Sequence, residues 1–142
     1  MDAYKVLLGE ILIQRKKITR EQLDAALGVQ KEKGGFLGEI FVNMGLLDER
    51  DIVVALVVQC GLPYIAVNKY AIDSNIVRLI PKEVAQKERV IALDRIGEIL
   101  SVVMMNPLTE EKKQYLESLT GCRVATFIST KAEIEEAIAR NY

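Results

Sequence analysis

Histidine is absent from this sequence of 142 residues, and cysteine occurs only at Cys60 and Cys122. Histidine is the side chain that most often carries protons near neutral pH and a very common metal ligand. Two distant cysteines are too few for a disulfide-rich secreted fold and lack the spacing of a zinc site. These absences argue against metalloenzymes with histidine ligands, histidine-based triads and cysteine–histidine nucleophiles. They favour a reducing, cytoplasmic compartment.

Long apolar runs and strong net charge are also missing. The longest apolar runs are short, such as the one that includes residues 53–58, and are far from the roughly 20 residues that span a bilayer. Asp2 and Glu10 interrupt the apolar N-terminus, and no cleavage site of small residues follows it. Because 19 basic and 20 acidic residues nearly cancel, no basic field attracts nucleic acid or anionic lipid. We expect a cytoplasmic protein or protein part, without membrane insertion or a nucleic-acid partner.

The motifs of common catalytic and phosphate-binding sites are not present. The sequence contains no G-x-x-x-x-G-K-[ST] loop, and no G-x-G-x-x-G follows a strand. The glycines within residues 34–38 lack the lysine and the hydroxyl residue that such a loop needs. The glutamate pairs at 110–111 and 135–136 lie in charge-rich helical stretches, which are typical of solvated faces. We therefore expect no enzymatic activity from this chain alone.

A repeat organises the first sixty residues. The segment Leu-Gly-Glu-Ile at 8–11 recurs at 37–40, and a gapless alignment of 7–30 with 36–59 has eight identities in 24 positions. A five-residue spacer separates the two copies, and both copies end in Ala-Leu-x-Val-Gln. Repetition over this length predicts that each copy forms one structural unit and that the two units pack together.

Each copy is predicted to form a helix, a turn and a second helix. Apolar residues recur at helical spacing, and Thr19 with Gln22 forms a capping box ahead of the second helix. Asp48 is the corresponding N-cap in the second copy, with Asp51 three residues later. The predicted helix stops are glycines, namely Gly34, Gly35, Gly45 and Gly61.

Both copies end in a glutamine, Gln30 and Gln59, one turn beyond a core leucine. A glutamine that points toward a core needs hydrogen-bond partners, which protein or ligand can supply. A glutamine at a frayed helix end is instead solvated, and this interpretation is favoured for either residue alone. Their repetition favours a shared purpose.

The pattern changes to α/β after Gly61. The order β-α-β-β-α-β-α predicts a split βαβ sheet. The sequence therefore predicts an α+β fold with a helical subdomain, 1–61, packed against an α/β subdomain, 62–142. The predicted elements are a strand at 63–67, a helix at 76–87 interrupted by Pro81, strands at 90–94 and 98–105 joined by a turn at 95–97, a helix at 109–119, a strand at 123–129 and a helix from 130.

Nearly the whole chain resembles the N-terminal domain of type II secretion and type IV pilus assembly ATPases. The segments that carry the resemblance are the doubled Leu-Gly-Glu-Ile, Gly-Leu-Pro-Tyr at 61–64, Leu-Ile-Pro at 79–81, Val-Ile-Ala-Leu at 90–93, Met-Met-Asn-Pro at 104–107, Leu-Thr-Gly at 119–121, and Ile134, Ala137 and Ile138 of the last helix. The resemblance implies a non-catalytic domain.

A subset of this family binds cyclic di-GMP through a doubled 24-residue motif with a five-residue spacer. In that motif glycines admit the ligand, leucines pack on guanine, glutamine bonds the guanine edge and arginine supplies charge. By resemblance, the candidate nucleotide-binding residues are Leu8, Gly9, Leu12, Leu27, Gln30, Leu37, Gly38, Gly45, Leu56 and Gln59. Other motif positions retained are Ile11 and Leu23 in the first copy and Ile40 and Leu46 in the second.

The chain departs from the motif where charge is needed. Leu7 and Phe36 occupy the two arginine positions, Lys16 replaces the internal glycine of the first copy, and Asn106-Pro107 replaces an Asp-Pro. Each lost charged hydrogen bond typically costs about 1.5–3 kcal/mol, so two losses could turn a micromolar site into a millimolar one. The basic residues at 15–17 and Arg20 could supply charge instead, although they also fit an ordinary solvated turn.

The resemblance implies a docking and regulatory domain of a secretion or pilus ATPase. Its expected partner is the cytoplasmic region of an inner-membrane platform protein, which would place it peripherally at that membrane. One alternative is a sensor that binds cyclic di-GMP through the doubled motif; apart from this ligand no cofactor or metal is expected. Another is a free-standing adaptor, whereas an ATPase domain in cis would make the chain the front end of a motor.

Overall fold

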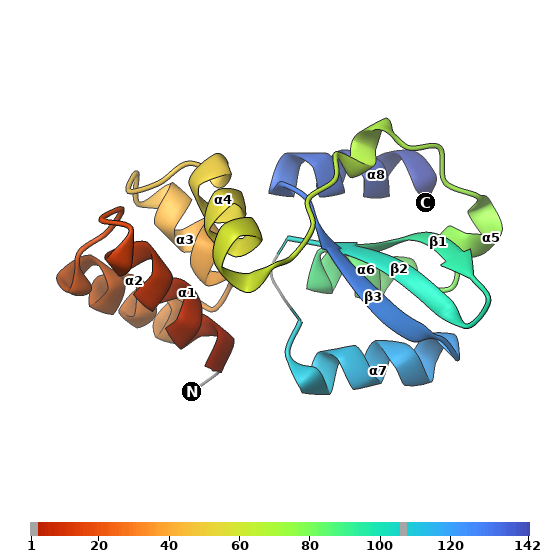
Figure 1. Cartoon of the computed structure of the whole chain (residues 1–142), viewed down its shortest axis with the longest axis horizontal. Coiled ribbons are helices and arrows are strands. Elements are labelled where there is room, and N and C mark those ends of the chain that lie inside the picture. The colour runs from red at the N-terminus through yellow and green to blue at the C-terminus, as the bar shows by residue number, and fades with distance from the viewer. Residues whose placement is uncertain (1–2, 106–107) are drawn as a thin grey trace. The chain divides into compact units, whose positions relative to one another are not determined.

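A computed structural model describes residues 3–105 and 108–142, and for residues 3–7, 59 and 60 it describes the backbone alone. The chain divides into two compact units, Met1–Gly61 and Leu62–Tyr142, named unit 1 and unit 2 below and coloured along the chain in Figure 1. The α+β class is confirmed, because unit 1 is helical and unit 2 contains a mixed sheet. The packing of the two halves on each other stays a prediction.

Unit 1 is built from two helix pairs, one from each sequence repeat. The first helix of each repeat packs on the second helix of the other, because α1 contacts α4 and α3 contacts α2. The four helices are α1 (Ala3–Gln14), α2 (Arg20–Lys33), α3 (Leu37–Asn43) and α4 (Glu49–Cys60). Positions 29 apart share one core, with Leu8 and Leu37, Ile11 and Ile40, Leu12 and Phe41, and Ala26 and Ala55 all buried.

The helix ends of unit 1 repeat as well. The predicted capping box at Thr19 and the predicted N-cap at Asp48 are confirmed, and Asp48 also forms a capping box with Asp51: Thr19 Oγ1 accepts from Gln22 N at 3.1 Å, and Asp48 Oδ1 accepts from Asp51 N at 2.8 Å. After the first helix of each repeat the backbone turns left-handed, with φ of 59° at Lys16 and 74° at Gly45. The sequence repeat therefore produces the same backbone conformation twice, even at the position where the first copy has Lys16 and the second has Gly45.

Unit 2 contains a three-stranded sheet in the order β1-β2-β3. β1 and β2 form an antiparallel hairpin, and β3 runs parallel to β2 after the crossover helix α7. The sheet lies between α7 and α8 in Figure 1. The elements are η1 (Val67–Lys69), α5 (Ser74–Val77), α6 (Lys82–Glu88), β1 (Val90–Ile96), β2 (Ile99–Met104), α7 (Glu110–Thr120), β3 (Arg123–Ile128) and α8 (Lys131–Asn141).

The predicted strand at 63–67 is wrong. The segment makes a single parallel bridge, Tyr64 to Ile128, and enters the 3₁₀ helix η1 at Val67. Pro63 has no N–H to donate, and the Ser129 hydroxyl bonds both the Ile65 carbonyl and the Val67 N–H, so a continuous ladder cannot form.

Two further boundaries differ from the sequence prediction. The helix predicted at 76–87 is two helices, α5 and α6, because Pro81 serves as the N-cap of α6 and breaks the run. β1 continues to Ile96, so the hairpin turn consists of Gly97 and Glu98 and not of residues 95–97. Gly97 has a φ of 60°, which suits the first central position of a two-residue type II′ turn.

Candidate functional site

The leucines of the doubled motif lie mostly inside unit 1. Leu8, Leu12 and Leu56 are completely buried and Leu37 is 2% exposed, whereas Leu27 on α2 is half-buried. A side chain without exposed surface cannot pack against a guanine ring unless the helices separate. Among the described candidate leucines, only Leu27 therefore presents appreciable surface to a ligand.

The motif glycines serve helix packing and helix termination. A Cβ atom added to Gly9 would lie 2.7 Å from Leu23 Cδ1, so this glycine lets α2 approach α1 closely. Gly38 is buried in α3. Gly45 is exposed and adopts its positive φ just after α3 ends. The fold alone accounts for glycine at 9 and 45.

The glutamine of the first copy is engaged within the chain. The side-chain Nε2 of Gln30 donates to the main-chain carbonyl oxygen of Gly35 at 2.9 Å, and the main-chain carbonyl of Gln30 accepts from Gly34 N at 2.7 Å. Both bonds close the end of α2 over the glycine-containing spacer. A ligand that used the Gln30 amide through Nε2 would have to replace the bond to Gly35. The Gln59 side chain lies outside the described part of the structure.

The two positions where the motif carries arginine do not supply charge. Phe36 is half-buried and occupies the N-cap of α3, without a side-chain capping bond. The Leu7 side chain lies outside the described residues, as does the Asn106-Pro107 pair.

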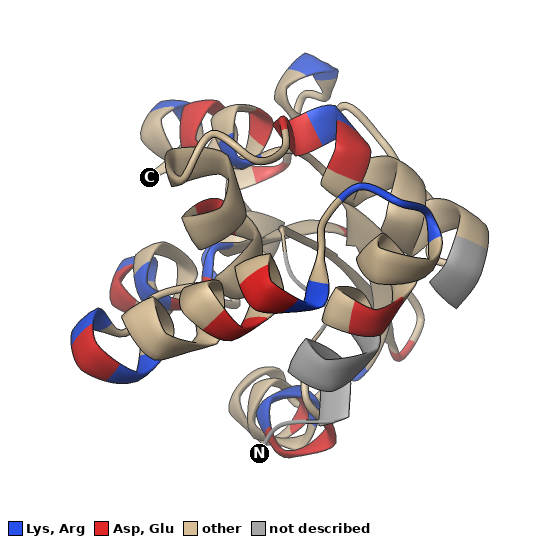
Figure 2. Ribbon diagram, turned by 90° about the vertical axis from the view of Figure 1, so that its left-hand side faces the viewer, with Lys and Arg blue, Asp and Glu red and all other residues tan. Residues whose placement is uncertain are grey.

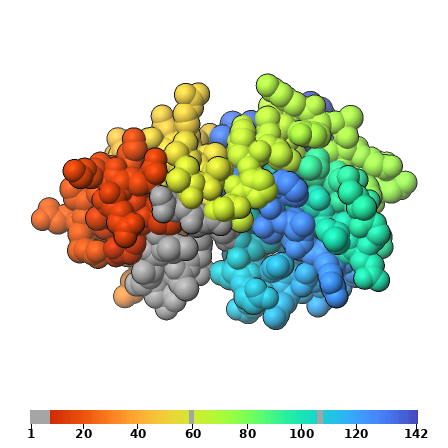
Figure 3. Space-filling model, viewed as in Figure 1, coloured from red at the N-terminus to blue at the C-terminus, as the bar shows by residue number. Residues whose placement is uncertain are grey.

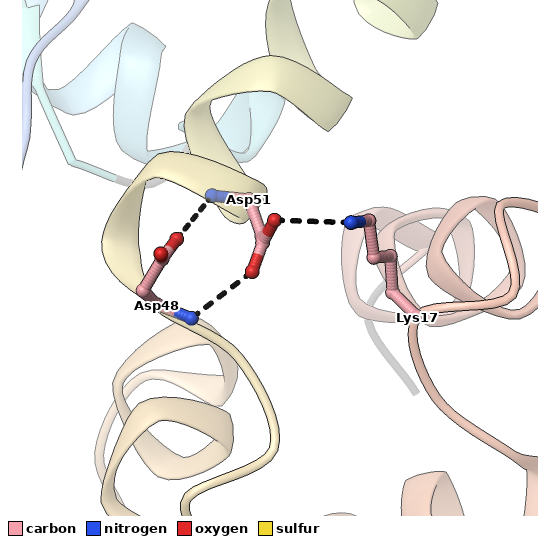
Figure 4. A network of polar contacts seen from close by, with 3 residues as sticks. All are labelled: Lys17, Asp48 and Asp51. Atoms are coloured by element: carbon pink, nitrogen blue, oxygen red, sulfur yellow. Dashed lines mark hydrogen bonds and ion pairs between the residues drawn. The ribbon is translucent and has the colours of Figure 1, made fainter.

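The basic turn after α1 forms ion pairs within unit 1. Lys17 Nζ lies 3.3 Å from Asp51 Oδ1, and Arg20 Nη2 lies 2.9 Å from Glu10 Oε1. In Figure 4, Lys17 reaches Asp51 while Asp48 and Asp51 cap the start of α4. The Asp48 N–H chiefly, with help from Lys17, holds the pKa of Asp51 below its usual value. These two cations already have carboxylate partners.

Sequence reasoning missed these ion pairs because their partners are far apart along the chain.

Acidic and basic residues are interspersed along the helices in the view of Figure 2. Across the described residues no group of three or more His, Cys, Asp or Glu side chains could hold a metal ion. No helix in that part of the chain has the length and apolar character needed to cross a membrane.

The chain is similar to pilus assembly ATPases along most of its length. It is 33% identical over 135 residues to the type IV pilus assembly ATPase PilB of Myxococcus xanthus, covering 95% of this chain and 24% of that protein. It is 34% identical over 137 residues to PilB of Thermus thermophilus, covering 95% of this chain and 15% of that protein. The chain thus spans a quarter or less of the length of these two relatives.

Two solved structures share the fold. A structure of MshE with cyclic di-GMP (cdg) has a TM-score of 0.75 and 26% identity, covering 95% of this chain and 98% of that one. The N-terminal domain of XpsE has a TM-score of 0.81 and 17% identity, covering all of this chain and 98% of that one. The MshEN domain family matches residues 60–142. The resemblance inferred from sequence is thereby confirmed, and the chain belongs to the MshEN domain family found in pilus and secretion ATPases.

Proposed function

We propose that the chain is a non-catalytic docking and regulatory module of a type IV pilus or type II secretion ATPase. It binds the cytoplasmic region of a membrane-platform protein and thereby holds the motor peripherally at the inner membrane. Family membership supports the motor context, with the ATP-hydrolysing domain in cis. The internal use of the motif residues supports docking over ligand binding, because Gln30 and most of the described leucines already serve the fold.

The observation that carries the docking proposal is an exposed apolar pair at the hairpin tip of unit 2. Ile96 is 73% exposed and Ile99 is 49% exposed, and the two residues lie directly opposite each other across β1 and β2. The two-residue turn holds both side chains on one face of the sheet, so little conformational entropy is lost when a partner covers them. Along the chain, Ile96 and Ile99 are flanked by the charged residues Arg95 and Glu98, and an apolar centre with polar residues at its edge is typical of a protein contact.

Binding to the purified cytoplasmic domain of the platform protein tests this proposal. We expect a complex at tens of micromolar or tighter, and Ile96→Asp or Ile99→Asp should weaken it about tenfold or more. The matched control is Tyr115→Asp, which places the same charge at an exposed apolar residue outside the hairpin, on α7. This variant should bind normally. The absence of a complex at tens of micromolar would overturn the docking proposal. Normal binding by both isoleucine variants would reject the hairpin tip as its site.

Cyclic di-GMP sensing is the second candidate function. The MshE structure that shares this fold was solved with that ligand. The candidate residues stay those of the doubled motif, and Leu27 and Gln30 are the half-buried members on α2. Titration calorimetry with cyclic di-GMP separates the candidates. A submicromolar site abolished by Gln30→Ala or Gln59→Ala would place sensing ahead of docking.

A further inference from the structure

The stretch that opens unit 2, residues 62–70, is fastened to the last strand and the last helix of the same unit. This stretch is named the connector below, because it directly follows Gly61 at the end of unit 1. Its main chain bonds β3 twice, since Ile128 N donates to Pro63 O at 2.8 Å and Ile65 N donates to Ile128 O at 2.9 Å. The space-filling view shows its yellow-green atoms beside the blue atoms of β3 (Figure 3).

Ser129 is the buried centre of this attachment. It has no exposed surface, and its hydroxyl donates to the Ile65 carbonyl while accepting from Val67 N at 3.3 Å. One hydroxyl thus satisfies two main-chain groups of an irregular segment. A buried polar group without a partner costs about 1–3 kcal/mol, so these bonds are a strong reason for serine here.

Helix α8 adds a row of polar contacts along one face. Residues 133, 136 and 140 have the i, i+3, i+7 spacing of a single helical stripe. Glu133 Oε2 accepts from Tyr64 Oη at 2.6 Å, and Glu136 Oε2 accepts from Asn68 Nδ2 at 2.9 Å.

The last position of the stripe, Arg140, bonds the connector main chain. Its Nη2 donates to the carbonyl oxygen of Asn68 and, at 3.4 Å, to that of Tyr70. The neighbouring positions of α8, Ile134, Ala137 and Ile138, are buried in the core. The helix therefore presents its apolar side to the core and this polar stripe to the connector.

We propose that Ser129 and the α8 stripe form a clasp that makes the connector and α8 one rigid body. A displacement of the connector is then transmitted along α8 to its C-terminal end, where the Tyr142 hydroxyl donates to the carbonyls of Val77 and Ile80. The clasp is a conformational relay inside unit 2. Its use in regulation rests on the proposed function, whereas its existence does not.

The relay predicts a cooperative opening that leaves the central strand closed. The clasp consists mainly of bonds between side chains and main chain, whereas β2 is paired on both sides. Proteins open in such contiguous groups at a lower free energy than global unfolding. Weakening one end of the clasp should therefore loosen amides at its other end while Val103 in β2 stays protected.

Amide hydrogen exchange on the whole chain tests the clasp without any partner. We expect Arg140→Met to speed exchange at Ile65 N–H about tenfold or more, although the acceptor of that amide, Ile128 O, is unchanged. Ser129→Ala should likewise speed exchange at Tyr142 N–H, whose own acceptor, Ile138 O, is also unchanged. Arg78→Met, at the exposed arginine that forms the C-cap of α5, is the control and should alter neither amide.

Two outcomes would overturn the clasp. One is an exchange rate at the Ile65 N–H that stays within twofold of the parent rate in Arg140→Met. The other is equal acceleration at Val103, which would show general destabilisation. Because Arg140 is exposed, its variant keeps the test informative even if Ser129→Ala folds poorly. Failure of platform binding would leave this result unaffected, so the two proposals fail separately.

Discussion

The two copies of the motif in unit 1 fold alike, yet they use equivalent residues differently. Leu27 is half-buried where Leu56 is completely buried, and Lys16 adopts the left-handed turn that Gly45 adopts in the second copy. The capping boxes differ too, with neutral Gln22 opposite acidic Asp51. The pattern therefore specifies a helix pair first, and nucleotide binding requires side chains beyond the ones that form the core.

The largest expected difference between the copies concerns their core leucines. Leu56→Ala should lower the free energy of unfolding by about 2–5 kcal/mol, because it leaves a cavity in a closed core. Leu27→Ala should lower the free energy of unfolding by less than about half that amount, since the Leu27 side chain is already partly exposed to solvent. Chemical denaturation followed by far-UV circular dichroism measures both. Equal costs would mean that Leu27 is as buried as its counterpart.

Two glycines of unit 1 should respond to alanine with opposite signs. Gly9→Ala should destabilise by about 1–3 kcal/mol, because its Cβ would overlap Leu23 in a packed interface. Gly28→Ala should stabilise by about 0.5–1 kcal/mol, because Gly28 lies inside α2 with no atom within 4 Å of an added Cβ. Thermal melts of the two variants provide the check. A neutral Gly9→Ala would show that Leu23 can move aside.

The left-handed turns allow a direct exchange of residues between the copies. Lys16→Gly should stabilise by up to about 1 kcal/mol, because glycine adopts a φ of 59° without steric cost. Gly45→Ala should destabilise by a similar amount for the converse reason. Chemical denaturation measures both changes: the midpoint should shift, while the dependence of the free energy of unfolding on denaturant concentration stays constant. Loss of stability in Lys16→Gly would show that the lysine side chain makes a compensating contribution.

The smallest predicted effect is an acid sensitivity confined to the second copy. The folded-state pKa of Asp51 is lowered, so its stabilising contribution is present above its unfolded value of 3.8 and is lost as pH falls through the folded value. Amide exchange at the start of α4 should therefore rise on acidification below about pH 4 more than exchange at the start of α2, where Gln22 does not titrate. Asp51→Asn should remove that difference. An equal rise in amide exchange at the starts of α4 and α2 of the parent chain would contradict this prediction.

The regular elements of this chain could be predicted from sequence because their signals are local. The capping box at Thr19, the N-cap at Asp48 and the helix stop at Gly61 each depend on residues within one turn. The repeat also predicted the paired cores of unit 1, since equivalent positions 29 residues apart are buried together.

The irregular parts could not be predicted, because long-range partners decide them. The sequence suggested a strand at 63–67 with its proline at the start, but pairing is limited to the bridge at Tyr64, and Ser129, far along the chain, takes the Ile65 carbonyl and the Val67 N–H. The Gln30 amide bonds Gly35, a partner only five residues away that residue type alone does not indicate.

We infer that the doubled motif of this chain serves the fold and lacks the charge that cyclic di-GMP requires. Titration calorimetry of the parent chain and of the double variant Leu7→Arg, Phe36→Arg with cyclic di-GMP tests it most directly. We expect no submicromolar binding by the parent and at least about tenfold tighter binding after both arginines are restored, since each adds a charged hydrogen bond. Submicromolar binding by the parent chain, lost in Gln30→Ala, would contradict it.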